Sequence, residues 1–135
     1  MSENQRLRLA LLLLRLGVFV VMLMWTVDKL VRPGHAAGVY AAFYGIAGLG
    51  AGPMVALAVA ELALLAAFVA GAFKPWSYAL VTLLHGVSTL SAFRQYLAPF
   101  EGPNLLFFAA WPMLAACVAL FLLRDRDTLM VLGKG

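Results

Sequence analysis

Four stretches of this chain are each long enough and apolar enough to cross a lipid bilayer. They cover residues 9–27, 53–73, 75–93 and 105–123. A transmembrane helix needs about 20 apolar residues to cross about 30 Å of hydrocarbon. The chain has 135 residues, of which 64% are hydrophobic and 12% charged, and a soluble domain of this size cannot bury so much apolar surface. The sequence therefore predicts one integral membrane domain over residues 1–135, an all-α bundle of four transmembrane helices.

The connection between the first two stretches, residues 33–52, is the longest one. Residues 36–45 are too apolar for an exposed loop and too few to span a membrane. Tyr40 and Tyr44 stand four positions apart and would share one face of a helix. We expect a short interfacial helix between spans one and two, followed by a glycine-rich turn. No strand precedes those glycines, so they do not form a dinucleotide-binding fingerprint.

The distribution of basic residues predicts the orientation. Seven of the ten lysines and arginines fall on the side of the N- and C-terminal segments, and three on the other side. The positive-inside rule then places both termini in the cytoplasm, and we expect a bacterial inner (plasma) membrane. Arg15 interrupts the first apolar stretch, which favours a retained span over a cleaved signal peptide. We expect Arg15 to snorkel to lipid phosphates as an anchor.

Several classes of chemistry are excluded by what the sequence lacks. Its basic residues are dispersed, in spite of a net charge of +4, so we expect no nucleic-acid partner. Cys117 is the single cysteine and can form neither an internal disulfide nor a redox pair. No ligand spacing indicates a metal site, and no motif indicates an intrinsic cofactor.

Polar residues inside the spans are the candidate functional residues, because each costs about 2.5–3.5 kcal/mol in hydrocarbon. Glu61 lies in the second span and His85 near the middle of the third. Ionisable residues at the outer span ends, together with two tryptophans, occupy the same half of the membrane. The candidate cavity therefore consists of Glu61, His85, Trp25 and Trp111, with Asp28, Lys29 and Arg94.

Two interpretations of these residues stay open. Asp28 can pair with Arg94 or Lys29, and Glu61 with Lys29 or another cation at this depth, which would fix the register of the helices or line a hydrated cavity. Alternatively, Lys29 and Arg94 simply snorkel to the interface, while Glu61 and His85 make ordinary hydrogen bonds between helices.

Short motifs along most of the chain resemble the DoxX-like family of small four-span membrane proteins. They include Leu14-Arg15-Leu16-Gly17, Asp28-Lys29-Leu30, Tyr40-Ala41-Ala42-Phe43-Tyr44-Gly45-Ile46, Ala60-Glu61-Leu62, Phe73-Lys74 and Asn104-Leu105-Leu106. The resemblance implies an association with quinone-linked oxidation of sulfur compounds, and Lys29 and Glu61 match the family's pattern. Relatives that act on thiols carry paired cysteines, which this sequence lacks, so the resemblance does not imply that activity.

Three functions follow from these features. The first is a non-catalytic subunit or scaffold of a membrane complex, with other membrane subunits or further copies of the chain as partners; this reading requires the least of the sequence. The second is a quinone-interacting subunit of a membrane oxidoreductase that uses the outer polar cavity. The third is a small permeation or lipid-handling protein. In none of them is the chain a complete enzyme on its own.

Overall fold

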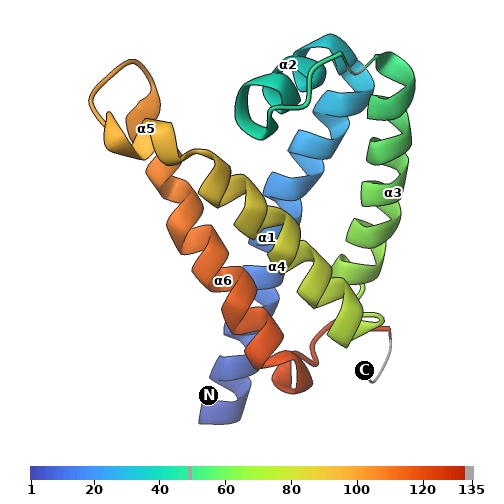
Figure 1. Cartoon of the computed structure of the whole chain (residues 1–135). Coiled ribbons are helices and arrows are strands. Elements are labelled where there is room, and N and C mark those ends of the chain that lie inside the picture. Colours follow the sequence, from blue (N-terminus) through green and yellow to red (C-terminus); the bar gives the residue numbers. More distant parts are fainter. Residues whose placement is uncertain (49, 133–135) are drawn as a thin grey trace.

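The computed structural model describes residues 1–48 and 50–132, which form helices joined by short turns. The elements are α1 (Glu3–Val31), α2 (Pro33–Tyr44), α3 (Ala51–Val69), α4 (Lys74–Ser91), α5 (Phe93–Leu97), the 3₁₀ segment η1 (Asn104–Ala109), α6 (Ala110–Leu122) and η2 (Arg124–Arg126) (Figure 1). Within these two ranges there is no strand, so the predicted all-α class is confirmed.

Local sequence signals set the ends of the helices. Ser2 caps α1: its hydroxyl accepts from the Gln5 amide at 3.2 Å, while the Gln5 side chain accepts from the Ser2 amide at 2.8 Å. This reciprocal arrangement satisfies amides that have no partner inside the helix. Pro33, Pro53 and Pro75 fall in the first turns of α2, α3 and α4, where the missing N–H is not needed.

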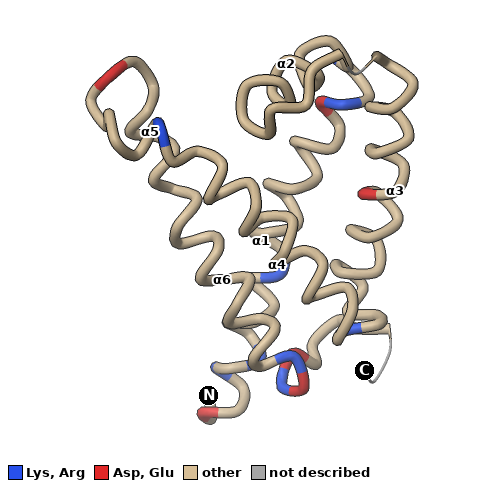
Figure 2. The backbone as a smooth tube through the Cα atoms, viewed as in Figure 1, with Lys and Arg blue, Asp and Glu red and all other residues tan. Residues whose placement is uncertain are grey.

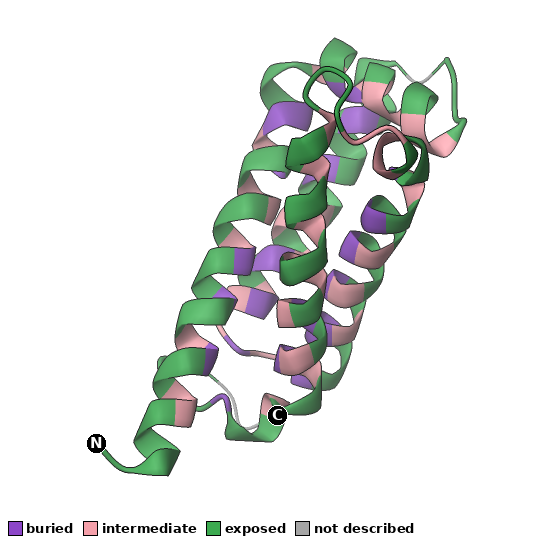
Figure 3. Ribbon diagram, turned by 90° about the vertical axis from the view of Figure 1, so that its left-hand side faces the viewer, coloured by how far each residue is buried: buried purple, intermediate pink, exposed green. Residues whose placement is uncertain are grey.

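The four longer helices form a bundle. α1 packs against α3 and α6, and α4 packs against the same two helices from the opposite side. Buried residues face inward on all four (Figure 3), around a core of Leu11, Val18, Leu65, Phe68, Tyr78, Val81, Cys117 and Leu120. We call the end that carries α2 and α5 the outer end, after the predicted orientation, and the end that carries η2 the inner end. The pair α4 and α6 leans away from α1 and α3 towards the outer end (Figure 1).

Three helical segments of the described chain are long and apolar enough to cross a membrane. They are Glu3–Val31, Ala51–Val69 and Asn104–Leu122, and only 17%, 22% and 11% of their most apolar windows are buried inside the protein. Most of their apolar surface therefore faces outward, as expected for a membrane protein. α4, the predicted third span, is not among them, and the 12-residue α2 occupies the predicted place of the interfacial helix; whether α4 spans the membrane and α2 lies at its interface stay predictions.

The prediction that Arg15 anchors the chain to lipid phosphates is wrong. Its side chain is fully buried and its Nη1 lies 2.6 Å from Oδ1 of Asp127, beyond the end of α6. Its Nη2 donates to the carbonyls of Leu129 and Met130 at 2.7 and 3.1 Å. A buried guanidinium needs such partners because the interior does not solvate charge.

A C-terminal strap, residues 127–132, closes the inner end of the bundle. Tyr78 donates to Oδ2 of Asp127 at 2.5 Å, and Lys74 donates to the Asp127 carbonyl at 2.5 Å. The Leu132 amide donates to the carbonyl of Ala70 at 2.8 Å. Many of the charged residues gather at this end (Figure 2). The inner half of the bundle therefore holds a buried polar network.

This network makes a prediction for stability. Arg15→Met should lower the free energy of unfolding in detergent by about 3–5 kcal/mol, because it leaves the Asp127 carboxylate buried without its charged partner. The double variant Arg15→Met/Asp127→Leu should lose much less, since it removes both charges. Thermal unfolding followed by circular dichroism measures the difference. A double variant less stable than either single variant would contradict the pairing.

Candidate ligand-binding cavity

An ion pair joins α1 to α3 near the outer end. Oε2 of Glu61 accepts from Nζ of Lys29 at 3.1 Å and from the hydroxyl of Thr26 at 2.9 Å. Thr26 and Lys29 stand three positions apart and so share the face of α1 that meets α3. The two charged side chains are only 10% and 16% exposed. Glu61 is thus held by one cation and one hydroxyl, and the pair as a whole is neutral.

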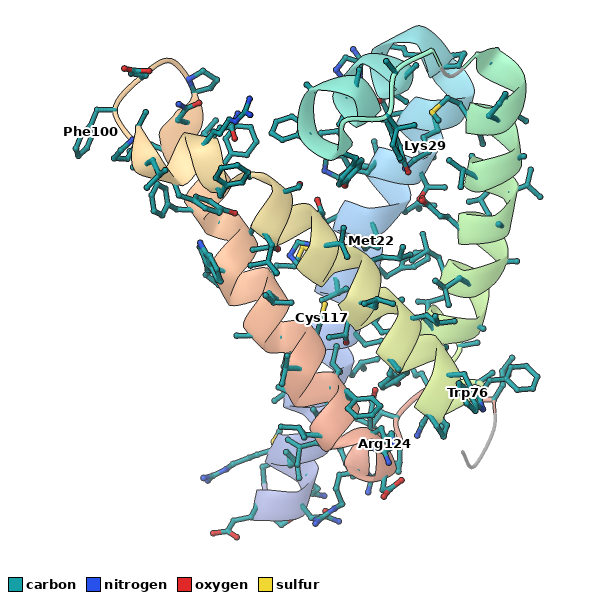
Figure 4. The ribbon with its side chains drawn as sticks, in the orientation of Figure 1. Met22, Lys29, Trp76, Phe100, Cys117 and Arg124 are labelled. Carbon is teal, nitrogen blue, oxygen red and sulfur yellow. The ribbon has the colours of Figure 1, made fainter. Side chains whose placement is uncertain are left out.

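Tyr40 of α2 lies beside this pair. Nζ of Lys29 is 5.9 Å from the centre of its ring, within the range of a cation–π attraction. Burial and, after it, the Glu61 carboxylate raise the pKa of Tyr40 to about 12. The hydroxyl therefore stays protonated at neutral pH and keeps a proton to donate. Lys29 lies under α2 in this part of the bundle (Figure 4).

Asp28 makes a separate contact at the corner between α1 and α2. Its Oδ1 lies 2.7 Å from Nη2 of Arg32, and its Oδ2 lies 2.7 Å from Nδ1 of His35. The carboxylate therefore ties α2 to the end of α1. It pairs with neither Lys29 nor Arg94, the two partners considered from the sequence. Arg94 lies on α5, with its guanidinium carbon 5.7 Å from the ring centre of Phe93.

A cavity of about 980 Å³ lies beneath α2 and extends along α1 from Lys29 as far as Leu13. Side chains of α1, α2, α4, η1 and α6 line it, and Glu61 reaches it from α3. Most of the lining is apolar, and its polar groups include Lys29, Tyr40, Glu61 and His85. A large apolar pocket with a few convergent polar groups is typical of a small-molecule site.

His85 contributes to the wall of this cavity from the middle of α4. It is nearly buried, and its Nε2 lies 3.0 Å from the carbonyl oxygen of Ala110 on α6. Its own carbonyl accepts from Thr89 at 2.7 Å. His85 therefore holds α4 to α6 and presents its ring to the cavity, and no group of three or more metal-ligating side chains surrounds it or occurs elsewhere in the described chain.

The structure brings together four of the seven residues that the sequence proposed. Lys29, Glu61, His85 and Trp25 line the same cavity. Trp111 packs instead on Tyr96, with 5.5 Å between ring centres. Among the described residues that line the cavity, Trp111, Asp28 and Arg94 do not appear.

Two residues that hold the candidate side chains in place, one bonded to Glu61 and one to Asp28, were not predicted from the sequence. Thr26 bonds Glu61, and its only signal is its place three residues before Lys29 on one helical face. His35 bonds Asp28 across the turn between α1 and α2, and the sequence gives no spacing that would reveal this, because the turn angle decides it.

Comparison with protein-family models, with curated proteins and with solved structures gave no match to this chain.

The Lys29–Glu61 pair predicts the outcome of charge removal. Glu61→Leu should destabilise the protein by about 3–5 kcal/mol, because Lys29 is left charged and nearly buried. Adding Lys29→Met should restore most of that loss. The stability of Glu61→Gln should lie between those of the wild type and of Glu61→Leu, since the amide oxygen of the glutamine can still accept a hydrogen bond from Thr26.

Thermal unfolding of the four proteins in one detergent measures these differences. Should Lys29→Met fail to rescue Glu61→Leu, Glu61 would act as a hydrogen-bond acceptor alone and the ion pair would carry no net stability.

Proposed function

We propose that this chain is a DoxX-like, four-span membrane protein that binds a quinone-class molecule in its outer cavity, as a non-catalytic subunit of a membrane oxidoreductase. The observation that carries the proposal is the neutral Lys29–Glu61 pair in the wall of an otherwise largely apolar cavity of about 980 Å³. A quinone combines an apolar ring and chain with two carbonyl acceptors. Lys29 and Tyr40 offer donors to such acceptors, and a neutral ring needs no counter-charge.

The fourth span in this proposal is α4. Its buried polar residues face the bundle interior, among them Lys74, Ser77, Tyr78, His85 and Thr89. Its exposed large side chains are all apolar: Trp76, Leu80, Leu83, Leu84, Val87 and Leu90. The average hydropathy of α4 is therefore low mainly because of its buried polar residues, which face the bundle interior and do not contact lipid. In a bilayer the outward surface of α4 resembles that of the other three helices.

The chain would need its electrons from elsewhere. Cys117 is buried and single, and the sequence has no cofactor motif, so Glu61 and His85 can hold a head group or exchange protons with it but supply no redox centre. This role requires a partner subunit in the membrane. We place the inner end, with Arg6, Arg8, Arg124 and Arg126, in the cytoplasm of a bacterial cell.

A scaffold remains the second candidate, and one observation favours it. Ala56, Ala60 and Ala63 form a row of small residues on α3, and all three are exposed. Rows of this kind let a neighbouring helix approach closely in lipid. The row can receive a partner helix or a second copy of the chain, whether or not the cavity binds a ligand.

Purification in mild detergent separates the two candidates. An organic extract of the wild-type protein, analysed by mass spectrometry, should contain close to one quinone per chain, and the Glu61→Gln protein should contain at least about tenfold less. Size-exclusion chromatography shows whether the variant is still folded. A stoichiometric protein partner without any bound small molecule would support the scaffold and reject the quinone proposal.

Labelling of single cysteines tests the four spans. In a Cys117→Ala background, cysteines introduced at Asn4 and Asp125 should react only from the cytoplasmic side, and cysteines at Gly34 and Gly102 only from the other side. A membrane-impermeant maleimide applied to intact cells and to inverted vesicles reports this. If the cysteines introduced at Asn4 and Asp125 react from opposite sides, we would conclude that α4 does not cross the membrane.

A further inference from the structure

The cavity is elongated, and its long axis follows α1. The residues of α1 that line it run from Lys29 to Leu13, which is about 24 Å at about 1.5 Å per residue. The lining residues of α4 run only from Leu83 to Ser91, about half that distance. Lys29, Tyr40 and Glu61 lie at one end of the cavity, His85 reaches it from the middle of α4, and the lining of α1 below Lys29 is apolar. The shape suits a molecule with a polar head and a hydrophobic chain.

The wall of this cavity is incomplete between α1 and α6. Gly17, Val21 and Trp25 line the cavity from α1, and all three are exposed. On the facing edge, Ala109 of η1 and Pro112 of α6 also line the cavity and are exposed. The cavity thus continues to the outer apolar surface of the bundle. In the proposed placement that surface contacts lipid chains.

Gly17 stands at the inner end of this edge. It lies in the interior of α1, where glycine is less stable than alanine by about 0.5–1 kcal/mol. A Cβ built on Gly17 meets no atom within 4 Å outside its own helix. Packing within this chain therefore does not require a glycine there. A glycine does leave the floor of the opening flat, so that a chain can lie directly on the helix backbone.

We infer that the ligand enters from the hydrocarbon between α1 and α6, and that its hydrophobic chain lies along α1 across Gly17 while its head meets Lys29 and Glu61. This inference rests on the proposed function and adds to it the ligand's chain, the entry route and the residue that the chain crosses. The ligand class is an amphiphile of the membrane with an uncharged head.

The test compares two probes that share one head group. One is a benzoquinone ring without an alkyl chain, and the other is the same ring carrying a ten-carbon chain. Binding to the full chain in lipid nanodiscs is followed by quenching of tryptophan fluorescence, because Trp25 lines the cavity. Gly17→Phe should weaken binding of the chain-bearing probe at least about tenfold, since several buried methylenes lose their place. The same substitution should change the affinity for the bare ring by no more than about twofold relative to the wild type.

Gly38→Phe is the matched control. Gly38 is also exposed, helical and free of any atom within 4 Å of a built Cβ, but it lies on α2 and is not among the described residues that line the cavity. Both probes should bind Gly38→Phe as they bind the wild type. Lipid partitioning of a probe is the same for all variants and cancels in the comparison.

The outcomes separate this inference from the proposed function. Equal binding of both probes to Gly17→Phe and to the wild type would overturn the chain placement and leave the proposed function standing. Equal weakening of both probes by Gly17→Phe would also overturn the placement, because the substitution would then act on the head site. Failure of the wild type to bind either probe would reject the proposed function itself.

Discussion

The structure depends on the requirement that a charge placed in an apolar interior has a partner. α1 carries three buried charges, and each has a partner. Asp28 pairs with Arg32 and His35 at the corner between α1 and α2, and the other two tie α1 to other parts of the bundle. Lys29 meets Glu61 of α3 at 3.1 Å near the outer end, and Arg15 meets Asp127 of the strap at 2.6 Å near the inner end. The two contacts are fourteen residues apart on one helix. Together they fix the position of α1 against both its neighbour in the bundle and the segment that follows α6.

The two ends of the bundle differ in consequence. At the inner end the strap fills the space below the core, and Val131 lies so close to Gly71 that a Cβ there would come within 2.4 Å of it. At the outer end α4 and α6 diverge from α1 and α3, and α2 crosses above them (Figure 1). Phe43 of α2 reaches Phe107 of η1, with 5.8 Å between ring centres. The cavity opens where the helices separate, beneath α2, and Glu61 and His85 line it.

The sequence predicted the helical class and four spans, and the three spans found as long apolar helices in the described chain were predictable because apolar runs of this length have few alternatives. It also gave Lys29 as one of the possible partners of Glu61, since a carboxylate in a span needs a cation and Lys29 lies at a similar depth. It could not find the partner of Arg15. Asp127 follows Arg15 by 112 residues and lies outside every apolar stretch, so only the return of the strap beneath the bundle brings it near. The positions of Trp111 and Arg94 depend on how far α5 and α6 lean, which periodicity does not encode.

The most direct test of this account is photocrosslinking at two adjacent valines of α1. Val20 and Val21 are 56% and 42% exposed, but of the two only Val21 lines the cavity in the described chain. A photoreactive residue at Val21, activated in intact membranes, should capture a quinone-class molecule, whereas the same residue at Val20 should capture bulk phospholipid. Identical adducts at both positions would contradict a ligand cavity open between α1 and α6.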